Sequence, residues 1–420
     1  MRLKASVLKE LLVLIRDIPG LIVLFLMPAV MIVVVTLVQD STVQNLKGNT
    51  IEILYIDNDQ DILGNTLLEG LQKSELFQIT SVLTSEAEAK KMVADGNYKM
   101  AVIIPKGTSD LIRKKVTPYI NSVFSGESPT AEKETAQTRI TIISDPTLRA
   151  TFRNAMLSSL QTYTAKIETS IMLQLLAENL EGMTGVKPEL KGEPVEAVEF
   201  VEEFAFENET SITPDSTQHN VPAWTMFAMF FIVIPLAGNM IQERNDGSFL
   251  RLLTMPGSYL TVLSGKTIVY MMVTFLQFVM MLAVGIFVLP ALGLPKLNLG
   301  THLLALLFMG AASGLAATGY GVLVGTIAET HEQSGVFGSI SVIILAALGG
   351  VWYPVYAMPA MMQNLSVLSP LNWGLNGFYE LFLKAGDFSE IAVYSGALIL
   401  FFIITIALSI LIEKIKRIHQ

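Results

Sequence analysis

Six long apolar runs divide the chain and predict helices that span a membrane. Each run has at least 18 residues and contains no Asp, Glu, Lys or Arg. About 20 apolar residues are needed for a helix to cross the hydrocarbon core of a bilayer. The predicted spans cover residues 21–38, 222–241, 268–289, 303–327, 336–353 and 391–412. An even number of spans requires both chain termini to lie on the same side of the membrane.

The first run has one alternative interpretation, a cleavable signal peptide. The apolar core of a signal peptide has about 7–15 residues, whereas residues 21–38 form a longer run. Residues 36–40, Thr-Leu-Val-Gln-Asp, also lack the small side chains that precede a cleavage site. We therefore expect a true transmembrane helix.

Two apolar segments are predicted to contact the membrane without crossing it. Residues 1–17 predict an amphipathic helix on the inner surface, with Lys4, Lys9 and Arg16 away from its apolar face. That face consists of Leu3, Val7, Leu8, Leu11, Leu12 and Ile15. Residues 354–388 are interrupted by three prolines, which favours a re-entrant or interfacial hairpin on the outer side.

Residues 40–220 have a different pattern, in which short strands alternate with helices. We expect strands at 51–56, 78–83, 100–104 and 139–144, and helices at 65–77, 85–95, 109–115 and 147–180. Ser85 with Glu88 three residues later predicts a capping box. This alternation indicates an α/β layer with a mostly parallel sheet. Residues 182–220 are rich in Gly, Pro and Glu, and we expect them to be extended or loosely ordered.

Composition and charge agree with a membrane protein that carries a soluble insert. Charged residues make up 15% of the chain and the mean hydropathy is +0.53, whereas soluble domains have about 25% charged residues. Residues 40–215 contain 27 acidic and 16 basic residues. The chain has no cysteine, which excludes disulfides, thiolate metal sites and a cysteine nucleophile. No basic stripe suggests nucleic-acid binding.

Basic residues near the span ends predict the orientation. Lys and Arg gather before span one, between spans two and three, and after span six. Such loops normally stay in the cytoplasm. We therefore expect an α-helical polytopic membrane protein with both termini cytoplasmic. Its six transmembrane helices, the first at 21–38 and the others within 222–420, would carry an inserted α/β extracytoplasmic domain at 40–220.

No segment predicts catalysis, a metal or a bound cofactor. Ser264–Thr267 resembles the end of a phosphate-binding loop, but Leu260 occupies the position of its first glycine. Carboxylates at strand ends raised the alternative of a calcium site, although the Gly and distal Glu of an EF-hand loop are missing, so solvated turn residues are favoured. These carboxylates are Asp57, Asp59, Asp61 and Asp145.

Residues 243–258, between spans two and three, contain the most informative local pattern. Glu243 and Arg244 follow the end of a span, and Gly247 predicts a turn. A short apolar helix then contains Phe249, Leu250, Leu252 and Leu253 and ends at Pro256. A short amphipathic helix of this kind can dock in the groove of a partner protein. The alternative is an ordinary solvated loop.

This segment resembles the signature of ABC-2 type transporter permeases. In that family a polar residue such as Asn239, a Glu-Arg pair, a Gly and a Leu-Leu-x-x-Pro run lie between the second and third spans. The resemblance continues in residues 57–59, 101–107 and 369–373, and it extends to the subgroup with a large extracytoplasmic domain between the first two transmembrane helices. Asn245-Asp246 departs from the pattern, because the family more often has Glu next to Arg.

The resemblance implies a permease subunit of the bacterial cytoplasmic (inner) membrane that has no nucleotide site of its own. It would pair with a second permease copy or a paralogue, and with cytoplasmic ABC ATPase subunits whose ATP hydrolysis drives export of a hydrophobic or amphipathic substrate, such as a drug or lipid. An envelope protein could bind the outer domain. The residues implied in coupling to the ATPase are Glu243, Arg244, Gly247, Phe249, Leu250, Arg251, Leu253 and Pro256.

Span four contains small residues at the spacing of close helix contacts. Gly310, Gly314, Gly321 and Gly325 predict tight packing, either within one subunit or between two copies. Span three contains Met271, Met272, Met280 and Met281, which would either line an adaptable apolar path or simply contact lipid and core.

Two other classes of function remain as alternatives. An ion-coupled secondary transporter would need charged groups within its spans, and the six apolar runs contain none. A membrane scaffold or receptor with an outer binding domain would need fewer spans and no inner docking helix.

Overall fold

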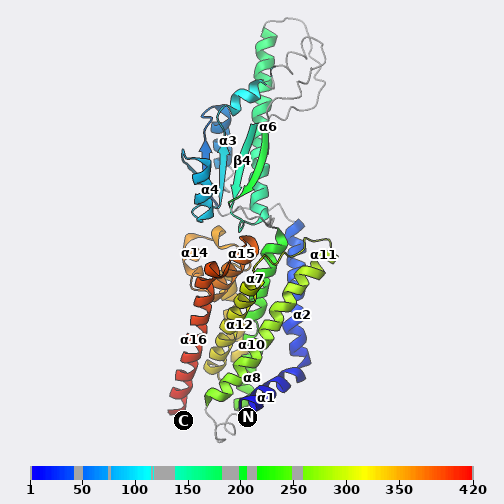
Figure 1. Cartoon of the computed structure of the whole chain (residues 1–420), viewed down its shortest axis with the longest axis vertical. Coiled ribbons are helices and arrows are strands. Elements are labelled where there is room, and N and C mark those ends of the chain that lie inside the picture. The colour runs from blue at the N-terminus through cyan, green and yellow to red at the C-terminus, as the bar shows by residue number, and fades with distance from the viewer. Residues whose placement is uncertain are drawn as a thin grey trace. The chain divides into compact units, whose positions relative to one another are not determined.

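Two compact units make up the chain (Figure 1). The computed structural model describes residues 2–41, 51–73, 77–114, 117, 138–181, 198–205, 215–247 and 259–418. Met1–Ser41 and Asn208–Gln420 form the helical unit, and Thr42–Glu207 form the α/β unit.

The helical unit contains the predicted membrane spans. Its elements are α1 (Arg2–Arg16), α2 (Ile18–Ser41), α7 (Ser216–Phe230), α8 (Val233–Asn245), α10 (Tyr259–Ala283), the π-helix η1 (Val284–Val288), α11 (Leu289–Ala291), α12 (Leu303–Ile327), α13 (His331–Leu348), the 3-10 helix η2 (Val355–Ala357), α14 (Ala360–Ser366), α15 (Pro370–Leu383) and α16 (Phe388–Ile418). Within the described residues, six helical segments are long and apolar enough to cross a membrane: Ile18–Leu37, Ser216–Asn245, Leu260–Ala291, Leu303–Ile327, His331–Leu348 and Phe388–Lys416. The predicted six-helix fold is confirmed.

The second span is the central helix of this unit. Every residue of α7 from Thr217 to Phe230 is buried, and α2, α10, α12 and α15 pack against it. In contrast, α2, α13 and α16 expose large apolar side chains such as Ile22, Ile340 and Ile403. Exposed apolar surface of this extent is unfavourable in water, and a lipid-facing helix presents such a surface.

Several span boundaries differ from those expected. The fifth span covers His331–Leu348 rather than residues 336–353, because the chain turns at Gly349 and Gly350, the latter with φ +88. The second span is interrupted by a turn at residues 231–232, between α7 and α8. Pro235 lies just beyond that turn and has no N–H to donate to the carbonyl of residue 231, which weakens the helix there. The third span begins at Leu260 rather than at residue 268. Lys266 therefore lies inside α10.

Glycines on α12 allow its neighbours to approach closely within one chain. A Cβ at position 325 would lie 3.0 Å from the Cα of Ala237 on α8, and one at position 321 would lie 3.2 Å from the Cα of Val233. A Cβ at Gly310 or Gly314 would lie 2.7 Å from the Phe278 ring or 2.6 Å from Thr274 Oγ1 on α10. All four glycines thus face neighbours in the same subunit.

Prolines define the segments of the predicted outer hairpin. Pro354 and Pro359 immediately precede η2 and α14, and Pro370 is the first residue of α15. A proline is compatible with the first helical turn, whose N–H groups have no helical partner. Whether this segment re-enters the membrane stays a prediction.

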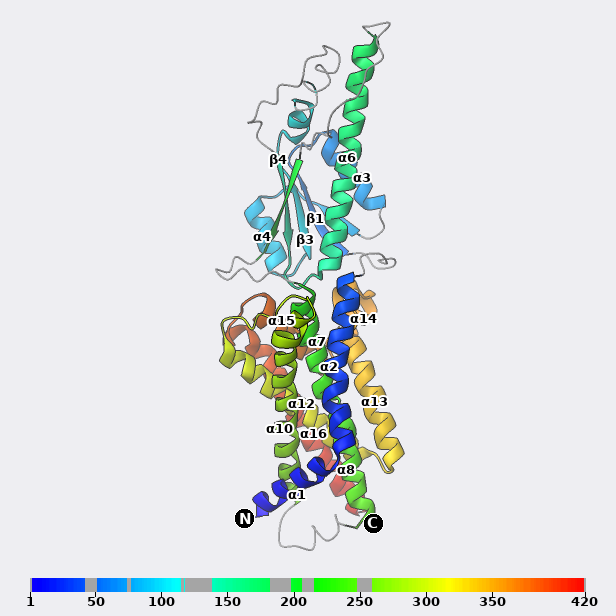
Figure 2. The ribbon, with the colours of Figure 1, turned by 90° about the vertical axis from the view of Figure 1, so that its right-hand side faces the viewer.

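The α/β unit is built on a five-stranded sheet (Figure 2). Its strands are β1 (Ile51–Asp57), β2 (Phe77–Ser81), β3 (Met100–Ile104), β4 (Thr138–Ser144) and β5 (Val198–Phe204), in the order β2-β1-β3-β4-β5. All neighbouring pairs are parallel except β3 with β4. The helices are α3 (Ile62–Lys73), α4 (Glu86–Ala94), residues 108–114 and α6 (Ala150–Glu181). The inserted α/β region is therefore confirmed.

The sequence predicted the elements of the α/β unit with different success. The capping box of α4 is present, with Ser85 Oγ accepting from the Glu88 N–H at 3.3 Å. The predicted helix at 65–77 ends earlier, since α3 stops at Lys73 and Phe77 already belongs to β2. Residues 182–220 contain β5, which was not predicted as a strand and pairs with β4 along its whole length.

Candidate functional site

One end of the helical unit brings together α1, the last turn of α8, the first turns of α10 and the end of α16. Figures 1 and 2 show both chain termini at this end. Gly247, with φ +66, turns the chain away from α8, and α10 begins at Tyr259. The predicted coupling segment, residues 243–258, therefore begins in the last turn of α8 and ends just before α10. Phe249, Leu250, Arg251, Leu253 and Pro256 lie outside the described residues.

Four charged side chains form an ionic cluster between α1, α8 and α10. Lys266 Nζ lies 2.8 Å from Glu10 Oε1 and 2.8 Å from Glu243 Oε1. Lys9 also pairs with Glu243, and it lies 3.2 Å from Glu10. The two ammonium groups balance the two carboxylates. Each acid contacts both bases, so three helices are joined through one charge-balanced contact.

Burial makes this cluster sensitive to the loss of its inner members, Glu10 and Lys266. The Glu10 side chain is 1% exposed and that of Lys266 is 4% exposed, whereas Lys9 is 33% exposed. Removing one partner of a buried ion pair costs about 3–5 kcal/mol, because the other charge stays buried without compensation. The innermost pair is therefore expected to affect stability most.

Lys9 remains charged over the whole physiological range. Partial burial opposes its charged form, but the hydrogen bond to Glu243 and the charges of Glu10 and Glu243 outweigh that effect and raise the pKa of Lys9. A raised folded-state pKa stabilises the fold fully below the unfolded value of about 10.4. That contribution is lost only as the pH rises through the higher folded-state pKa.

The sequence of α1 explains why its charge faces the protein. Glu10 and Leu14, one turn apart, are buried, while Leu8, Leu12 and Ile15 are exposed. The helix thus turns a carboxylate inward and apolar side chains outward, which suits a position at a membrane surface. Gly265 assists the contact, because a Cβ at that position would overlap Ser6 of α1. Gly265 and Lys266, which resembled part of a phosphate loop, instead form the contact of α10 with α1.

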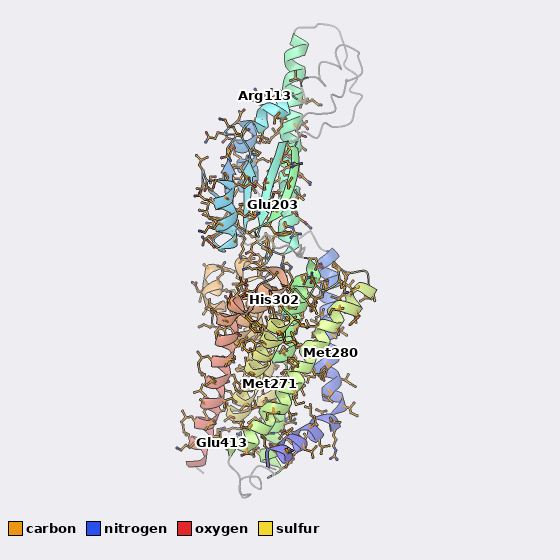
Figure 3. The ribbon with its side chains drawn as sticks, in the orientation of Figure 1. Arg113, Glu203, Met271, Met280, His302 and Glu413 are labelled. Carbon is orange, nitrogen blue, oxygen red and sulfur yellow. The ribbon has the colours of Figure 1, made fainter. Side chains whose placement is uncertain are left out.

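Arg244 joins α8 to two further helices. Its guanidinium lies 2.8 Å from Glu413 Oε2 on α16 and donates to the Gly325 carbonyl on α12 at 3.2 Å. Glu413 is labelled near the end of α16 in Figure 3. Lys416 donates to the carbonyls of Thr326 and Ile327 at 3.0 and 3.2 Å, so it caps the last turn of α12. The consecutive residues Glu243 and Arg244 therefore link α8 to different helices, Glu243 to α1 and α10 and Arg244 to α12 and α16.

These contacts change the expected role of the two charges. We expected Glu243 and Arg244 to be available for a partner protein, whereas both are paired within the chain. Sequence reasoning missed Glu10 and Glu413, and considered Lys266 only as an orientation signal and as part of a rejected phosphate-loop match. A single acid within an otherwise apolar or basic amphipathic helix is the signal that could have drawn attention to Glu10.

The carboxylates at the strand ends of the α/β unit have structural partners. Asp59 accepts from the Gly107 and Ser109 N–H groups at 2.7 and 3.0 Å and from the Ser109 hydroxyl. Asp145 pairs with Lys99 at 2.5 Å. Asp59 and Asp145 thus fix loops, whereas Asp57 accepts from the Asp59 and Gln60 N–H groups within its own turn, as expected of a turn residue. Over the described residues, no group of three or more His, Asp or Glu side chains could hold a metal.

Comparison with known proteins identifies the family. The family model described as ABC-2 family transporter protein matches residues 19–411. The linearmycin resistance permease protein LnrN of Bacillus subtilis strain 168 is 26% identical over 184 residues, which are 43% of this chain and 46% of the relative. The probable multidrug ABC transporter permease YbhR of Escherichia coli K12 is 26% identical over 161 residues, 38% of this chain and 42% of the relative. The chain thus spans less than half the length of these relatives. The family match includes the α/β insert and most of every span, so the chain belongs to the ABC-2 family of transporter proteins.

Proposed function

We propose that this protein is the membrane-spanning permease subunit of an ATP-binding-cassette exporter. ATP would be bound and hydrolysed by separate cytoplasmic ATPase subunits, and the permease would move a hydrophobic or amphipathic substrate outward. The observation that carries the proposal is the family match over residues 19–411. The names of the relatives, a linearmycin resistance permease and a probable multidrug permease, support a drug-like or lipid-like substrate.

The ionic cluster supports a mechanism for coupling. Residues 248–258 connect α8 to α10, and the Lys266–Glu243 contact holds the two flanking helices together at 2.8 Å. Glu10 adds α1 to the same group, while Arg244 extends it to α16. A displacement of residues 248–258 by an ATPase would therefore move several helices together. Glu243 and Arg244 transmit the movement, and the apolar residues of the segment dock on the partner.

The assembly follows from the same proposal. The permease would act with a second copy or a paralogue and with ATPase subunits in the cytoplasm. The bacterial relatives favour a bacterial inner membrane, and the basic residues beside the spans favour cytoplasmic termini. The α/β unit would then lie outside the cell membrane, where it is available to substrate or to an envelope protein.

Recovery of an ATPase with the full chain tests the proposal. The tagged chain, extracted from its own membrane in mild detergent, should retain a protein with ATPase activity that is absent from a mock purification. The chain purified without that partner should neither bind nor hydrolyse ATP. Saturable ATP binding by the chain alone would contradict the proposal.

A further inference from the structure

An apolar groove lies between α2 and α10, and the coupling mechanism makes no use of it. Its volume is about 460 Å³ and it is open on one side. Only apolar side chains line it: Ile18, Leu21, Ile22, Phe25, Leu26 and Ala29 of α2, Met280 of α10 and Val284 of η1. Met280 is labelled on α10 in Figure 3.

A buried glutamine fixes the spacing of the two groove walls. Pro28 has no N–H, so the carbonyl of Leu24, four residues earlier, lacks its helical donor. Gln277 of α10 supplies that donor, with Nε2 3.0 Å from the Leu24 oxygen and 3.3 Å from the Ala228 oxygen of α7. Gln277 is fully buried. It holds α2 beside α10 one turn from Met280, so the groove is a built feature of the helical unit.

We propose that this groove binds an acyl chain of an anionic phospholipid, with its headgroup at Arg16. The groove offers no polar side chains, and a buried polar group without a hydrogen bond is unfavourable, so the part of the ligand inside the groove should be apolar. From Ile18 to Ala29 the α2 wall rises about 16 Å, at about 1.5 Å per residue, which is enough to follow a long stretch of acyl chain. Ile22 and Leu26 on the rim are 53% and 58% exposed, so the opening faces the same side as the apolar outer surface of α2.

Charge at the α1–α2 junction selects the headgroup. Arg16 is exposed two residues before Ile18, and it makes no ion pair within the described part of the chain. The neighbouring Asp17 is engaged locally, because its Oδ1 accepts from the Gly20 N–H at 3.1 Å. The exposed apolar face of α1 places this junction at the level of lipid headgroups. A basic residue near an anionic membrane surface contributes about 1 kcal/mol, or about a fivefold preference.

The groove and the headgroup residue can be tested separately in vesicles. The full chain is reconstituted in phosphatidylcholine vesicles that contain a minor fraction of phosphatidylglycerol with a photoactivatable acyl chain, and labelled peptides are mapped by mass spectrometry. We expect labels in residues 18–29 and 280–284. Ala29→Phe fills the groove and should reduce this labelling at least fivefold. Val30→Phe, which adds the same ring at an exposed position outside the groove, should leave it unchanged.

Arg16→Gln tests the headgroup. It should reduce the preference for labelled phosphatidylglycerol over labelled phosphatidylcholine about fivefold, whereas Lys4→Gln, an exposed change elsewhere on α1, should not. Met280→Phe provides a second groove-filling variant from the opposite wall and should reproduce the effect of Ala29→Phe. Each variant is first checked for the elution volume of the wild-type protein.

Three results would overturn this proposal. Labelling that spreads evenly over the exposed faces of α2 and α13 would indicate ordinary surrounding lipid. Labelling that survives both groove-filling variants would exclude the groove. Efficient disulfide formation between two copies of a Leu26→Cys variant of this cysteine-free chain would show that a second copy covers the groove instead. None of these results depends on an ATPase, so the proposal stands or falls separately from the transport function.

Discussion

Lys266 on α10 lies 2.8 Å from Glu243 on α8, and these two helices flank residues 248–258. The contact joins the helices that precede and follow the segment that the family resemblance assigns to ATPase coupling. Glu10 reaches the same Lys266 from α1, so a helix near the start of the chain shares the contact. Movement of any one of these helices therefore requires the others to move or the cluster to open.

Removing the most buried base should destabilise the helical unit far more than removing the outer one. Lys266→Met leaves Glu10 and Glu243 with only the partly exposed Lys9, and should lower the free energy of unfolding by about 3–5 kcal/mol. Lys9→Met should cost about 1 kcal/mol or less, because a third of its side chain is exposed. Denaturant titration in mixed micelles measures both. Equal effects of the two variants would contradict the burial argument.

The Arg244–Glu413 pair should show a charge-swap rescue. Arg244→Glu places two carboxylates together at the end of α8 and should impair substrate-stimulated ATPase activity of the assembled transporter. Adding Glu413→Arg restores opposite charges and should recover part of the activity. Recovery should be incomplete, because the Gly325 carbonyl still loses its donor. No recovery in the double variant would mean that Arg244 acts on a partner rather than through Glu413.

The sequence predicted what local patterns encode and missed what distant residues create. Hydropathy located all six spans, and Ser85 with Glu88 located the start of α4. The pairing of Glu10 with Lys266 joins residues 256 positions apart, so no local period indicates it. β5 follows a segment rich in Gly and Pro and is stabilised by pairing with β4. The break between α7 and α8 occurs inside a continuous apolar run, where hydropathy alone does not distinguish a turn from a helix.

Two glycine substitutions should have opposite effects on stability. Gly325→Ala places a methyl group 3.0 Å from the Ala237 Cα, and should destabilise the helical unit by about 1–3 kcal/mol through overpacking. Gly396→Ala on α16 meets no atom within 4 Å, and should be neutral or stabilising by up to about 1 kcal/mol, since alanine favours a helix. Apparent melting temperatures in one detergent compare the two. A tolerated Gly325→Ala would mean that α8 and α12 are less closely packed.

Single cysteines should report the proposed orientation. Ala87 on α4 and Glu329, between α12 and α13, are both exposed. With an impermeant thiol reagent on spheroplasts, Ala87→Cys should react, and Glu329→Cys should react only after lysis. Because the chain has no native cysteine, the labels are unambiguous. External labelling of Glu329→Cys on intact spheroplasts would contradict the cytoplasmic position of the ionic cluster.

The most direct test of the central claim measures ATP-driven export by the permease assembled with its co-purifying ATPase. The same measurement is made on a Phe249→Ala/Leu253→Ala variant. Burial of each side chain in a partner is worth about 1.5–3 kcal/mol, so the variant should lose most ATPase binding while it inserts and folds normally. We predict that wild-type proteoliposomes export a hydrophobic substrate only when ATP is present, and that the variant loses both partner and export. Wild-type partner recovery and export by the variant would contradict residues 248–258 as the coupling segment, and export without ATP would contradict the proposed transporter.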